Sequence, residues 1–439
     1  MSIFSNYPKV SRGTAHVIRL KENVPIKQRP YRMSPQQREA LQKEVEYLVE
    51  NGLAEESKSE WASPCIMVRK PDGTFRMCTD YRKLNNITVK DSFPMPRVDD
   101  IIDSVASANF LSKLDLLKGF YQVELEKESR DIAAFVTPSG LYNYTVMPFG
   151  LCNSPITFQR HMNFILRNLE RVYVYLDDII VIGNTWETHL DRLRKVFERL
   201  EEYDVTVNLA KCEFGKTTVK YLGHEIGNGV VKPLDCHIDS IKNFSKPQTK
   251  KELMSFLGSV GYYRKFCKNF SDISSPLTHL LKKNSVFKWT EECNDAFEKL
   301  KLILMSKPVI HAPCFEKPFK LYIDSSEIAA GGVLLQEYEI LYPIAYFSKK
   351  YNEHQQRYSI VEKEALSLVL NLNHFEVYLK HSPFVTEIFT DNNPLTFINK
   401  CKQNNKRILR WSLFLQEYNF KINHIRGKNN VIADALSRL

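Results

Sequence analysis

Two adjacent aspartates interrupt an apolar stretch near the middle of the chain. Asp177 and Asp178 stand between runs 171–176 and 179–182, which read as two strands joined by a turn. Adjacent carboxylates suit a tight hairpin poorly, and like charges held side by side raise each other's pKa or require a counter-ion. Mg²⁺ is a natural counter-ion, because it prefers oxygen ligands and keeps waters and substrate phosphates. A purely structural turn is the alternative.

A second set of acids occupies the C-terminal part of the chain. Asp324 and Asp391 each end an apolar strand pattern, and Asp434 lies in a terminal helical pattern. On the helix between the two strands, Glu364 projects from the apolar face, whereas Glu362 is about 200° around the helix. An inward carboxylate without a partner is costly, and a nearby metal ion relieves that cost.

Further acidic and anion-binding features lie upstream of the paired aspartates. Asp115 ends an apolar strand pattern just before a turn that contains Gly119, and an isolated aspartate at a strand end is usually a turn cap. Residues 146–153 form a loop that leads into a helix, for which Ser154 suits the N-cap and Pro155 the first position. The free amide groups of such a helix start would face an anion.

A hairpin is predicted at residues 65–79, where Asp72-Gly73 separates two strand patterns. With these two residues as the loop, Arg69 faces Arg76 across the strands. Directly opposed arginines repel each other unless an anion lies over them, so the pairing suggests a phosphate-binding ribbon. Two solvated arginines splayed apart are the alternative.

The composition is that of a soluble, multidomain chain. With 439 residues, 43% hydrophobic and 26% charged, it exceeds a single core and excludes whole-chain disorder, collagen and coiled coil. Nine cysteines without a CxxC pair argue against a disulfide framework or zinc knuckle and favour a reducing compartment. No apolar run approaches the ~20 residues of a membrane span, so we expect an intracellular protein.

Basic residues exceed acidic ones in a way that suits a polyanionic partner. Lys and Arg number 61 against 51 Asp and Glu, a surplus of +10. Between residues 242 and 288 the ratio is ten to two. There, 250–266 alternates apolar and basic residues at helical spacing, which predicts a helix packed inward and touching phosphates outward. A merely solvated face is the alternative.

The order and spacing of these motifs resemble a reverse transcriptase, with its fingers, palm and primer-gripping hairpin. Five segments carry the resemblance: 76–85, Leu114-Asp115 through Tyr121, Met147 through Gln159, Tyr175-Leu-Asp-Asp178, and Tyr221-Leu222-Gly223 with the strand that follows. The resemblance implies phosphoryl transfer with two metal ions, one activating the primer 3′-hydroxyl and the other holding the triphosphate. Asp115 and Asp177 would bridge the ions. Strand alternation places Asp178 on the opposite face, as a supporting acid.

The same resemblance implies a nucleotide site made of Arg69, Lys70, Arg76, Phe120, Phe149, Gly150 and Gln159. Arg76, with Arg69 or Lys70, would neutralise the triphosphate. Phe120 takes the position of a family ring that collides with a ribose 2′-hydroxyl, which implies a preference for deoxynucleotides.

The C-terminal segment resembles ribonuclease H, whose four metal-binding acids match Asp324, Glu364, Asp391 and Asp434. His424 stands where many such nucleases carry a mobile catalytic histidine, and an ordinary strand histidine is the alternative. Basic residues between 400 and 428 outnumber acidic ones eight to one, which suits a hybrid-binding surface.

Together these features are similar to a gypsy-type LTR retrotransposon reverse transcriptase, with plant pararetroviral enzymes as the alternative. We expect an α+β and α/β multidomain chain, a right-hand polymerase followed by an RNase H-like domain. About eighty residues separate the grip hairpin from the first nuclease strand, which leaves no room for a connection domain. The expected domains are an arm (1–34), fingers (35–107, 126–145), palm with primer grip (108–125, 146–234), helical thumb (235–314) and RNase H domain (315–439).

The implied cofactor is Mg²⁺, two ions per active site, with Mn²⁺ as a substitute. The implied partners are an RNA/DNA hybrid, a primer-template and dNTPs, with a homodimer on substrate or a monomer equally consistent and no membrane. We expect the protein in the cytoplasm, within virus-like particles. No Asp-Thr/Ser-Gly protease motif precedes the polymerase motifs and no integrase follows them, so we expect one segment of a polyprotein.

Three alternative functions compete with this interpretation. A nucleic-acid-binding protein that kept the fold and lost the chemistry is disfavoured because all seven expected acids are present. A telomerase-type or intron-type polymerase would lack the attached nuclease. A polymerase with an inactive nuclease is the third.

Overall fold

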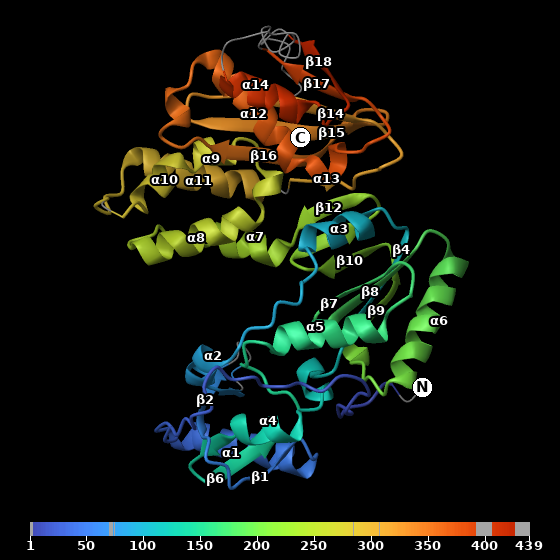
Figure 1. Cartoon of the computed structure of the whole chain (residues 1–439), viewed down its shortest axis with the longest axis vertical. Helices are drawn as coiled ribbons and strands as arrows, with labels where there is room; N and C mark the ends of the chain where they lie inside the picture. The colour runs from blue at the N-terminus through green and yellow to red at the C-terminus, as the bar shows by residue number, and fades with distance from the viewer. Residues whose placement is uncertain are drawn as a thin grey trace. The chain divides into compact units, whose positions relative to one another are not determined.

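The computed structural model describes residues 3–69, 73, 75–283, 285–306, 308–391 and 406–425. The chain forms two compact units (Figure 1). The first is Met1–Ile101 with Ala108–Val219, and the second is Ile102–Ser107 with Lys220–Leu439. Helix α3 (Val98–Ala106) crosses the boundary between them.

The first unit begins with an arm and a five-stranded sheet of order β1-β6-β5-β2-β3. Its elements are α1 (Pro35–Glu50), β1 (Ala54–Glu56), β2 (Ser63–Arg69), β3 (Phe75–Thr79), α2 (Arg82–Ile87), α4 (Lys127–Ile132), β5 (Phe135–Thr137) and β6 (Gly140–Tyr144). Helix α1 begins with a capping box, in which the Ser34 hydroxyl accepts from the Gln37 N–H. Leu41, Val45 and Leu48 of α1 join the core of this sheet.

A second sheet in this unit, of order β7-β8-β4-β9, carries the first group of acids. Its elements are β4 (Phe110–Asp115), η1 (Gly119–Gln122), α5 (Ser154–Ile165), β7 (Val172–Tyr175), β8 (Asp178–Gly183), α6 (Trp186–Glu202), η2 (Leu209–Lys211) and β9 (Glu213–Lys216). Strand β8 is apolar and buried from Ile179 onward. Helices α5 and α6 share one core with its inward residues Ile179 and Val181.

The start of α5 lies one residue from its predicted position. Ser154 is the first helical residue and Asn153 is the N-cap. The Ser154 hydroxyl donates to the Pro148 carbonyl instead of capping the helix. Asn153 is engaged elsewhere, since its amide donates to the Val89 carbonyl.

The second unit opens with a small sheet of order β10-β11-β12-β13 and a set of helices. The elements are β10 (Thr218–Tyr221), β11 (His224–Gly227), β12 (Val230–Pro233), α7 (Asp235–Lys242), α8 (Lys250–Tyr262), η3 (Arg264–Phe266), α9 (Phe270–Ile273), α10 (Ser275–Leu280), α11 (Glu291–Met305) and β13 (Ile310–His311). Leu253, Phe256 and Val260 form the buried stripe of α8, whereas Lys250 and Lys251 are not buried. The inward half of the predicted pattern is therefore confirmed.

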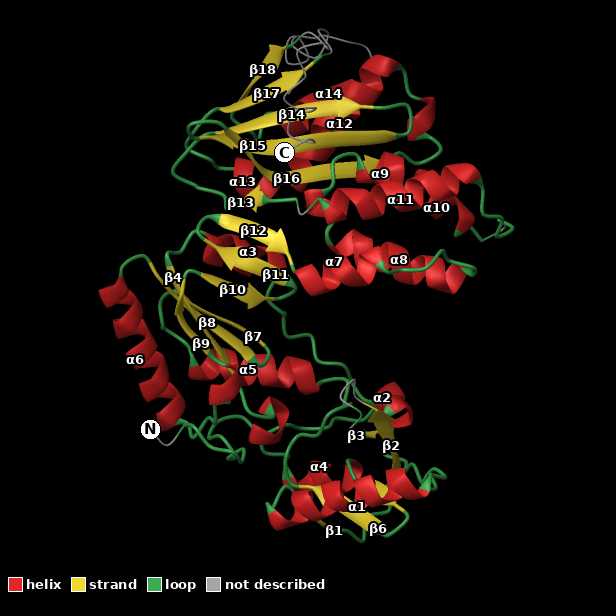
Figure 2. Cartoon of the chain, turned by 180° about the vertical axis from the view of Figure 1, so that it is seen from behind, coloured by secondary structure: helices red, strands yellow, loops and turns green. Residues whose placement is uncertain are grey.

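The rest of the second unit is built on a five-stranded sheet of order β16-β15-β14-β17-β18 (Figure 2). The elements are β14 (Phe319–Ser325), β15 (Ala329–Glu337), β16 (Leu341–Lys350), η4 (Gln355–Arg357), α12 (Ile360–His374), α13 (Glu376–Leu379), β17 (Thr386–Thr390), α14 (Lys406–Leu415) and β18 (Phe420–His424). Strands β14, β15 and β16 are antiparallel neighbours, whereas β17 pairs in parallel with β14 and β18. Helix α12 packs its buried face on this sheet.

Two candidate active sites

The first candidate site lies where β4 ends and β8 begins. Asp115 is the last residue of β4 and pairs directly with Asp178, the first residue of β8. The Leu116 N–H donates to the Asp177 carbonyl at 3.1 Å. The structure therefore brings Asp115, Asp177 and Asp178 together from two separate segments.

The predicted orientation of Asp178 is wrong. Residues directly opposed in an antiparallel pair point to the same face of the sheet, so Asp178 shares a face with Asp115. The reason is the turn: Leu176 is left-handed, with φ at 52°, and Asp177 lies in the turn, where strand alternation does not apply. Asp178 also shares its face with Lys113, whose Nζ lies 3.1 Å from Asp178 Oδ1.

Asp177 carries a buried carboxylate oxygen without a partner. Its Oδ1 accepts no hydrogen bond among the described residues. Burial, together with the charges of Asp115 and Asp178, raises the pKa of Asp177 to about 6. An orphaned carboxylate oxygen among carboxylates is the arrangement that a divalent cation would neutralise.

Gly119 makes this crowding sterically feasible. A Cβ at Gly119 would lie 2.2 Å from Asp177 Oδ1 and 2.9 Å from Phe158 Cζ. Because no side chain fits there, the residue that precedes Phe120 must be glycine for Asp177 to keep its place. The sequence indicated a turn at Gly119, and the structure adds this close approach.

Two lysines partly neutralise the acids, and sequence reasoning missed both. Lys113 pairs with Asp178, and Lys211 Nζ lies 3.4 Å from Asp115 Oδ1. Burial raises the pKa of Asp178, and Lys113 opposes that shift. Lys113 could have been found, because it lies two residues before Asp115 and so on the same face of β4. Within the described ranges, no three His, Cys, Asp or Glu side chains stand ready to hold a metal ion.

Gln159 was expected to contact a nucleotide, and in this structure its polar groups bind the backbone of the turn at Leu176. Its side chain is 0% exposed. Its Oε1 accepts from the Leu176 N–H at 2.8 Å, and its Nε2 donates to the Val174 carbonyl at 3.0 Å. Gln159 therefore holds the turn that carries Asp177, from helix α5.

Phe120 and Phe149 form an aromatic pair next to this turn. Their ring centroids are 4.9 Å apart, and Phe149 is 39% exposed. Asn85 of α2 fixes the adjoining loop, because its amide donates to the Gly150 carbonyl and its oxygen accepts from the Cys152 N–H. Asn85 is the last residue of the 76–85 segment that carried the resemblance, but nothing in the sequence indicated that its side chain binds this loop.

The predicted arginine pair is wrong in register. Arg69 pairs with Phe75, and Arg76 pairs with Val68. This pairing is shifted by one residue from the expected alignment, because five residues (70–74) rather than two separate the paired residues of β2 and β3. The two arginines therefore point to opposite faces of the ribbon. Lys70 lies outside the described residues.

The hairpin expected to grip a primer is present in the second unit. Leu222 and Gly223 form its two-residue turn, both with positive φ, 43° and 73°. Tyr221 is 1% exposed and belongs to the core. The hydroxyl groups of Tyr262 and Tyr263 donate to the carbonyls of Leu222 and Gly223.

The second candidate site lies on the five-stranded sheet. Asp324 is near the end of β14, Asp391 follows β17, and these strands are parallel neighbours. Glu364 of α12 is 7% exposed, as its inward position predicted, and its Oε2 has no partner among the described residues. Burial, together with the charges of Asp391 and Asp324, raises the pKa of Glu364 to about 8.

Several hydrogen bonds hold these acids in place. The Ser325 N–H donates to Asp324 Oδ1 at 2.8 Å, and the Ser367 hydroxyl donates to the Asp324 carbonyl at 2.9 Å. Ser367 follows Glu364 by one helical turn, so it fixes α12 against β14. His424 is exposed at the end of β18, with Nε2 3.2 Å from the Asp391 carbonyl. Asp434 lies outside the described residues.

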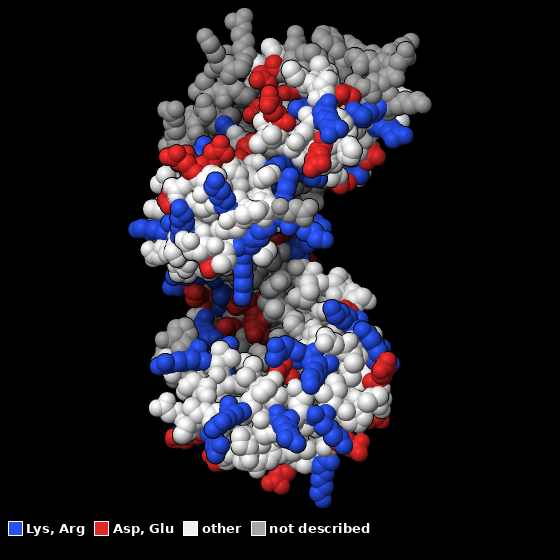
Figure 3. All heavy atoms as spheres, turned by 90° about the vertical axis from the view of Figure 1, so that its left-hand side faces the viewer, with Lys and Arg blue, Asp and Glu red and all other residues white. Residues whose placement is uncertain are grey.

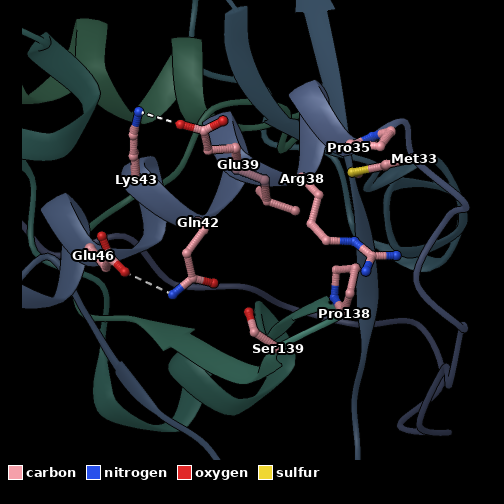
Figure 4. Close-up of a pocket in the computed structure, with 10 residues that line it drawn as sticks. Met33, Pro35, Arg38, Glu39, Gln42, Lys43, Glu46, Pro138 and Ser139 are labelled. Carbon is pink, nitrogen blue, oxygen red and sulfur yellow. Dashed lines mark hydrogen bonds and ion pairs between the residues drawn. The ribbon is translucent and has the colours of Figure 1, made fainter.

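A pocket in the first unit lies beside α1, next to the sheet of order β1-β6-β5-β2-β3 (Figure 4). About 740 Å³ in volume, it is lined by α1 and by Pro138 and Ser139. Four of its polar side chains form two pairs, Lys43 with Glu39 and Gln42 with Glu46. It contains none of the predicted site residues.

The basic segment does more than face solvent. Basic side chains are spread over the face of the molecule in Figure 3 rather than confined to one patch. Lys250 Nζ donates to the Lys282 carbonyl and Arg264 to the Ser348 carbonyl. Part of the predicted phosphate-binding block thus supports the fold. No helix in the described ranges combines the length and apolarity needed to cross a bilayer.

Comparison with known proteins finds a family match for each of the two segments that contain these acids. Residues 68–226 match the family model of reverse transcriptase (RNA-dependent DNA polymerase), and residues 314–418 match the RNase H-like domain found in reverse transcriptase. A solved foamy viral protease-reverse transcriptase dRH in complex with double-stranded DNA is 25% identical, covering 96% of this chain and 76% of that chain, with a TM-score of 0.86. Another, in complex with an RNA/DNA hybrid, is 24% identical over 97% of this chain and 59% of that chain, with a TM-score of 0.79. The fold is a reverse transcriptase followed by an RNase H-like domain.

The relatives define the group more narrowly. The Pol polyprotein of transposon 297 from Drosophila melanogaster is 39% identical over 97% of this chain and 40% of its own length. The transposon Tf2-3 polyprotein from Schizosaccharomyces pombe is 35% identical over 98% of this chain and 33% of its own length. The chain belongs to the gypsy-type LTR retrotransposon reverse transcriptases. It spans about a third to two fifths of the length of these relatives.

Both families generally use divalent metal ions. The residues fit such ions, because each site offers carboxylate oxygens and contains one buried oxygen without a partner, Asp177 Oδ1 and Glu364 Oε2.

Proposed function

We propose that this chain is an RNA- and DNA-templated DNA polymerase that also degrades the RNA strand of RNA/DNA hybrids. The observation that carries the proposal is the pair of separate acid centres, each with a buried, unpartnered carboxylate oxygen. The family matches to residues 68–226 and 314–418 support one activity for each centre. The substrates are a primer-template, dNTPs and an RNA/DNA hybrid.

In the polymerase centre, Asp115 and Asp177 hold the cations and Asp178 supports them. Two Mg²⁺ ions, with Mn²⁺ as a substitute, would lower the pKa of the primer 3′-hydroxyl and neutralise the triphosphate. Gln159 and Gly119 keep the Asp177 carboxylate at a fixed place. Lys113 and Lys211 balance the acids before the ions bind.

The nucleotide lies against the Phe120 and Phe149 rings, and Arg76 neutralises its phosphates. Lys70 is the second cation, because Arg69 points to the opposite face of the ribbon from Arg76. The Phe120 ring excludes a 2′-hydroxyl. Gly150 presents its backbone to the nucleotide, in a loop that Asn85 holds. The hairpin at Tyr221, Leu222 and Gly223 positions the primer through its backbone, because the Tyr221 ring is buried.

In the nuclease centre, Asp324, Glu364, Asp391 and Asp434 hold the cations, again two. Glu364 would be one of the carboxylates that hold a cation, and its buried, unpartnered Oε2 would face that charge. His424 lies next to Asp391 and shuttles a proton or product at the exposed edge.

The proposal extends to organisation and location. The domains keep the boundaries expected from the sequence: arm 1–34, fingers 35–107 and 126–145, palm 108–125 and 146–234, thumb 235–314 and nuclease 315–439. The protein acts in cytoplasmic virus-like particles, where retrotransposon RNA is copied.

Separating the two activities tests the proposal. Asp177→Asn should abolish primer extension on an RNA template while leaving hybrid cleavage intact, and Glu364→Gln should do the reverse. Loss of both activities in either variant, or binding without extension by the parent protein, would contradict the assignment.

A further inference from the structure

The helical segment before the nuclease sheet covers the edge strand of that sheet. Strand β16 is at the edge, where unpaired backbone groups need a partner. Arg264 donates to the Ser348 carbonyl, and the Ser271 N–H donates to the Ser348 hydroxyl at 3.0 Å. Lys350 of β16 donates to Ser275. The segment from Arg264 to Ser275, which we call the thumb clamp, is thus bound to the nuclease strand by several hydrogen bonds.

The thumb clamp also reaches the turn that follows Asp324. The Ser326 hydroxyl has two acceptors within reach, Asp272 Oδ1 at 2.7 Å and the Ala329 carbonyl at 3.2 Å, and it donates to the closer one, Asp272. The same hydroxyl oxygen accepts from the N–H groups of Ile328 at 3.3 Å and Ala329 at 2.9 Å. Ser326 therefore organises the turn between β14 and β15, and Asp272 fixes the direction of its hydroxyl.

This turn carries one end of the nuclease site. The Ser325 N–H donates to Asp324 Oδ1 at 2.8 Å, so movement of the backbone at Ser325 would move the Asp324 carboxylate. Asp272 is half-buried and near enough to Asp324 for its charge to be felt: burial raises the pKa of Asp272, and Asp324 raises it further, whereas Lys350 lowers it.

We propose that Asp272 is a positioning residue of the nuclease, whose carboxylate accepts the Ser326 hydroxyl proton and so holds the turn that orients Asp324. The inference rests on the proposed nuclease function. It couples the two halves of the second unit, since a residue of the thumb clamp sets the geometry of a nuclease acid. Asp272 acts through Ser326 and does not itself touch substrate.

Two substitutions distinguish the hydrogen bond from the charge. Asp272→Ala removes the acceptor, whereas Asp272→Asn keeps an oxygen acceptor without the charge. Asp272→Ala should reduce hybrid cleavage about 10-fold, the usual effect of losing a residue that orients a metal ligand, and Asp272→Asn should retain parental cleavage. Asp239→Ala, the same change at an exposed position of α7, is the matched control and should cleave like the parent.

A second measurement does not depend on activity. In the metal-free full chain, hydrogen exchange of the Ile328 and Ala329 amides should accelerate in Asp272→Ala and remain parental in Asp272→Asn and Asp239→Ala. If the parent protein cleaved no hybrid, the proposed nuclease function would fail. The exchange rates alone would then decide whether Asp272 holds the turn.

The remaining outcomes overturn the inference. Parental cleavage or parental exchange in Asp272→Ala would show that the turn does not need the thumb clamp. Equal loss in Asp272→Asn would assign the effect to charge. Equal loss of primer extension and cleavage in Asp272→Ala would indicate a general loosening of the second unit.

Discussion

Replacing Gly119 by alanine is the sharpest perturbation of the polymerase centre. The glycine does not have positive φ, so alanine adds a methyl group without backbone strain. That methyl would lie 2.2 Å from Asp177 Oδ1 and 3.0 Å from Asp177 Cγ. Because such contacts are not found below 3.0 Å, the oxygen must move by at least about 0.8 Å. Gln159 holds the backbone of the turn, so the side chain takes up the displacement.

The expected effect follows from that displacement. A misplacement of about 1 Å at a reacting centre costs on the order of 100-fold in rate, or about 2.7 kcal/mol of transition-state stabilisation. Single-turnover primer extension on an RNA template should therefore slow about 100-fold in Gly119→Ala. Hybrid cleavage by the same preparation should be unchanged, since the nuclease acids lie in the other unit.

A matched glycine provides the control. The three heavy atoms nearest to a Cβ at Gly140 all belong to the Tyr142 side chain, and the closest is its hydroxyl oxygen at 3.2 Å. Gly140→Ala should keep extension within about 2-fold of the parent, because that side chain can yield slightly. Thermal unfolding followed by circular dichroism verifies that both variants are folded. Folded Gly119→Ala that extends primers within about 3-fold of the parent would refute the reasoning.

Three further predictions concern both centres. Gln159→Ala should destabilise the first unit by about 1–3 kcal/mol, because it leaves backbone groups of the turn without a hydrogen-bond partner. The same variant should reduce primer extension at least 10-fold. Primer extension at the parental rate would contradict the role of Gln159 in holding the turn. In the metal-free protein, Glu364 is protonated when folded up to about pH 8 but ionised when unfolded above about pH 4.3. The free energy of unfolding should therefore fall as pH rises from about 4.3 to about 8, by up to about 1.4 kcal/mol per pH unit. Denaturant titrations at several pH values should show a weaker pH dependence of this free energy for Glu364→Gln. An equal pH dependence in the parent and the variant would contradict the raised pKa of Glu364. Phe120→Ala should admit ribonucleotides in an incorporation assay, and unchanged discrimination would remove that role.

Local patterns in the sequence identified the features that depend on one element. Ser34 caps α1 in a capping box that is complete within four residues, so this helix start depends on the local sequence alone. Glu364 faces inward as predicted, because helical periodicity fixes its direction. The acids of each site were found by type and spacing, and the fold brought Asp115 next to Asp178.

The failures share a physical cause, since each depends on a turn or a partner far along the chain. Arg69 and Arg76 point to opposite faces because the loop between β2 and β3 is longer than predicted. A shift of one residue in strand register turns each side chain to the other face of the sheet. The left-handed backbone at Leu176 places Asp177 in a turn. The in-and-out alternation of strand side chains, which was used to predict the direction of Asp178, therefore does not apply to Asp177. Gln159 is occupied by backbone groups of a turn 15 to 17 residues away, and nothing in its own helix indicates that partner.

Anomalous scattering from crystals of the metal-free protein soaked in Mn²⁺ tests the central claim most directly. The account predicts manganese between Asp115 and Asp177, and separately manganese between Asp324, Glu364 and Asp391. Asp177→Asn should remove the first signal and leave the second. Manganese at neither acid cluster, with both clusters ordered as described, would contradict the claim that these two groups of carboxylates are the metal centres of a polymerase and a nuclease.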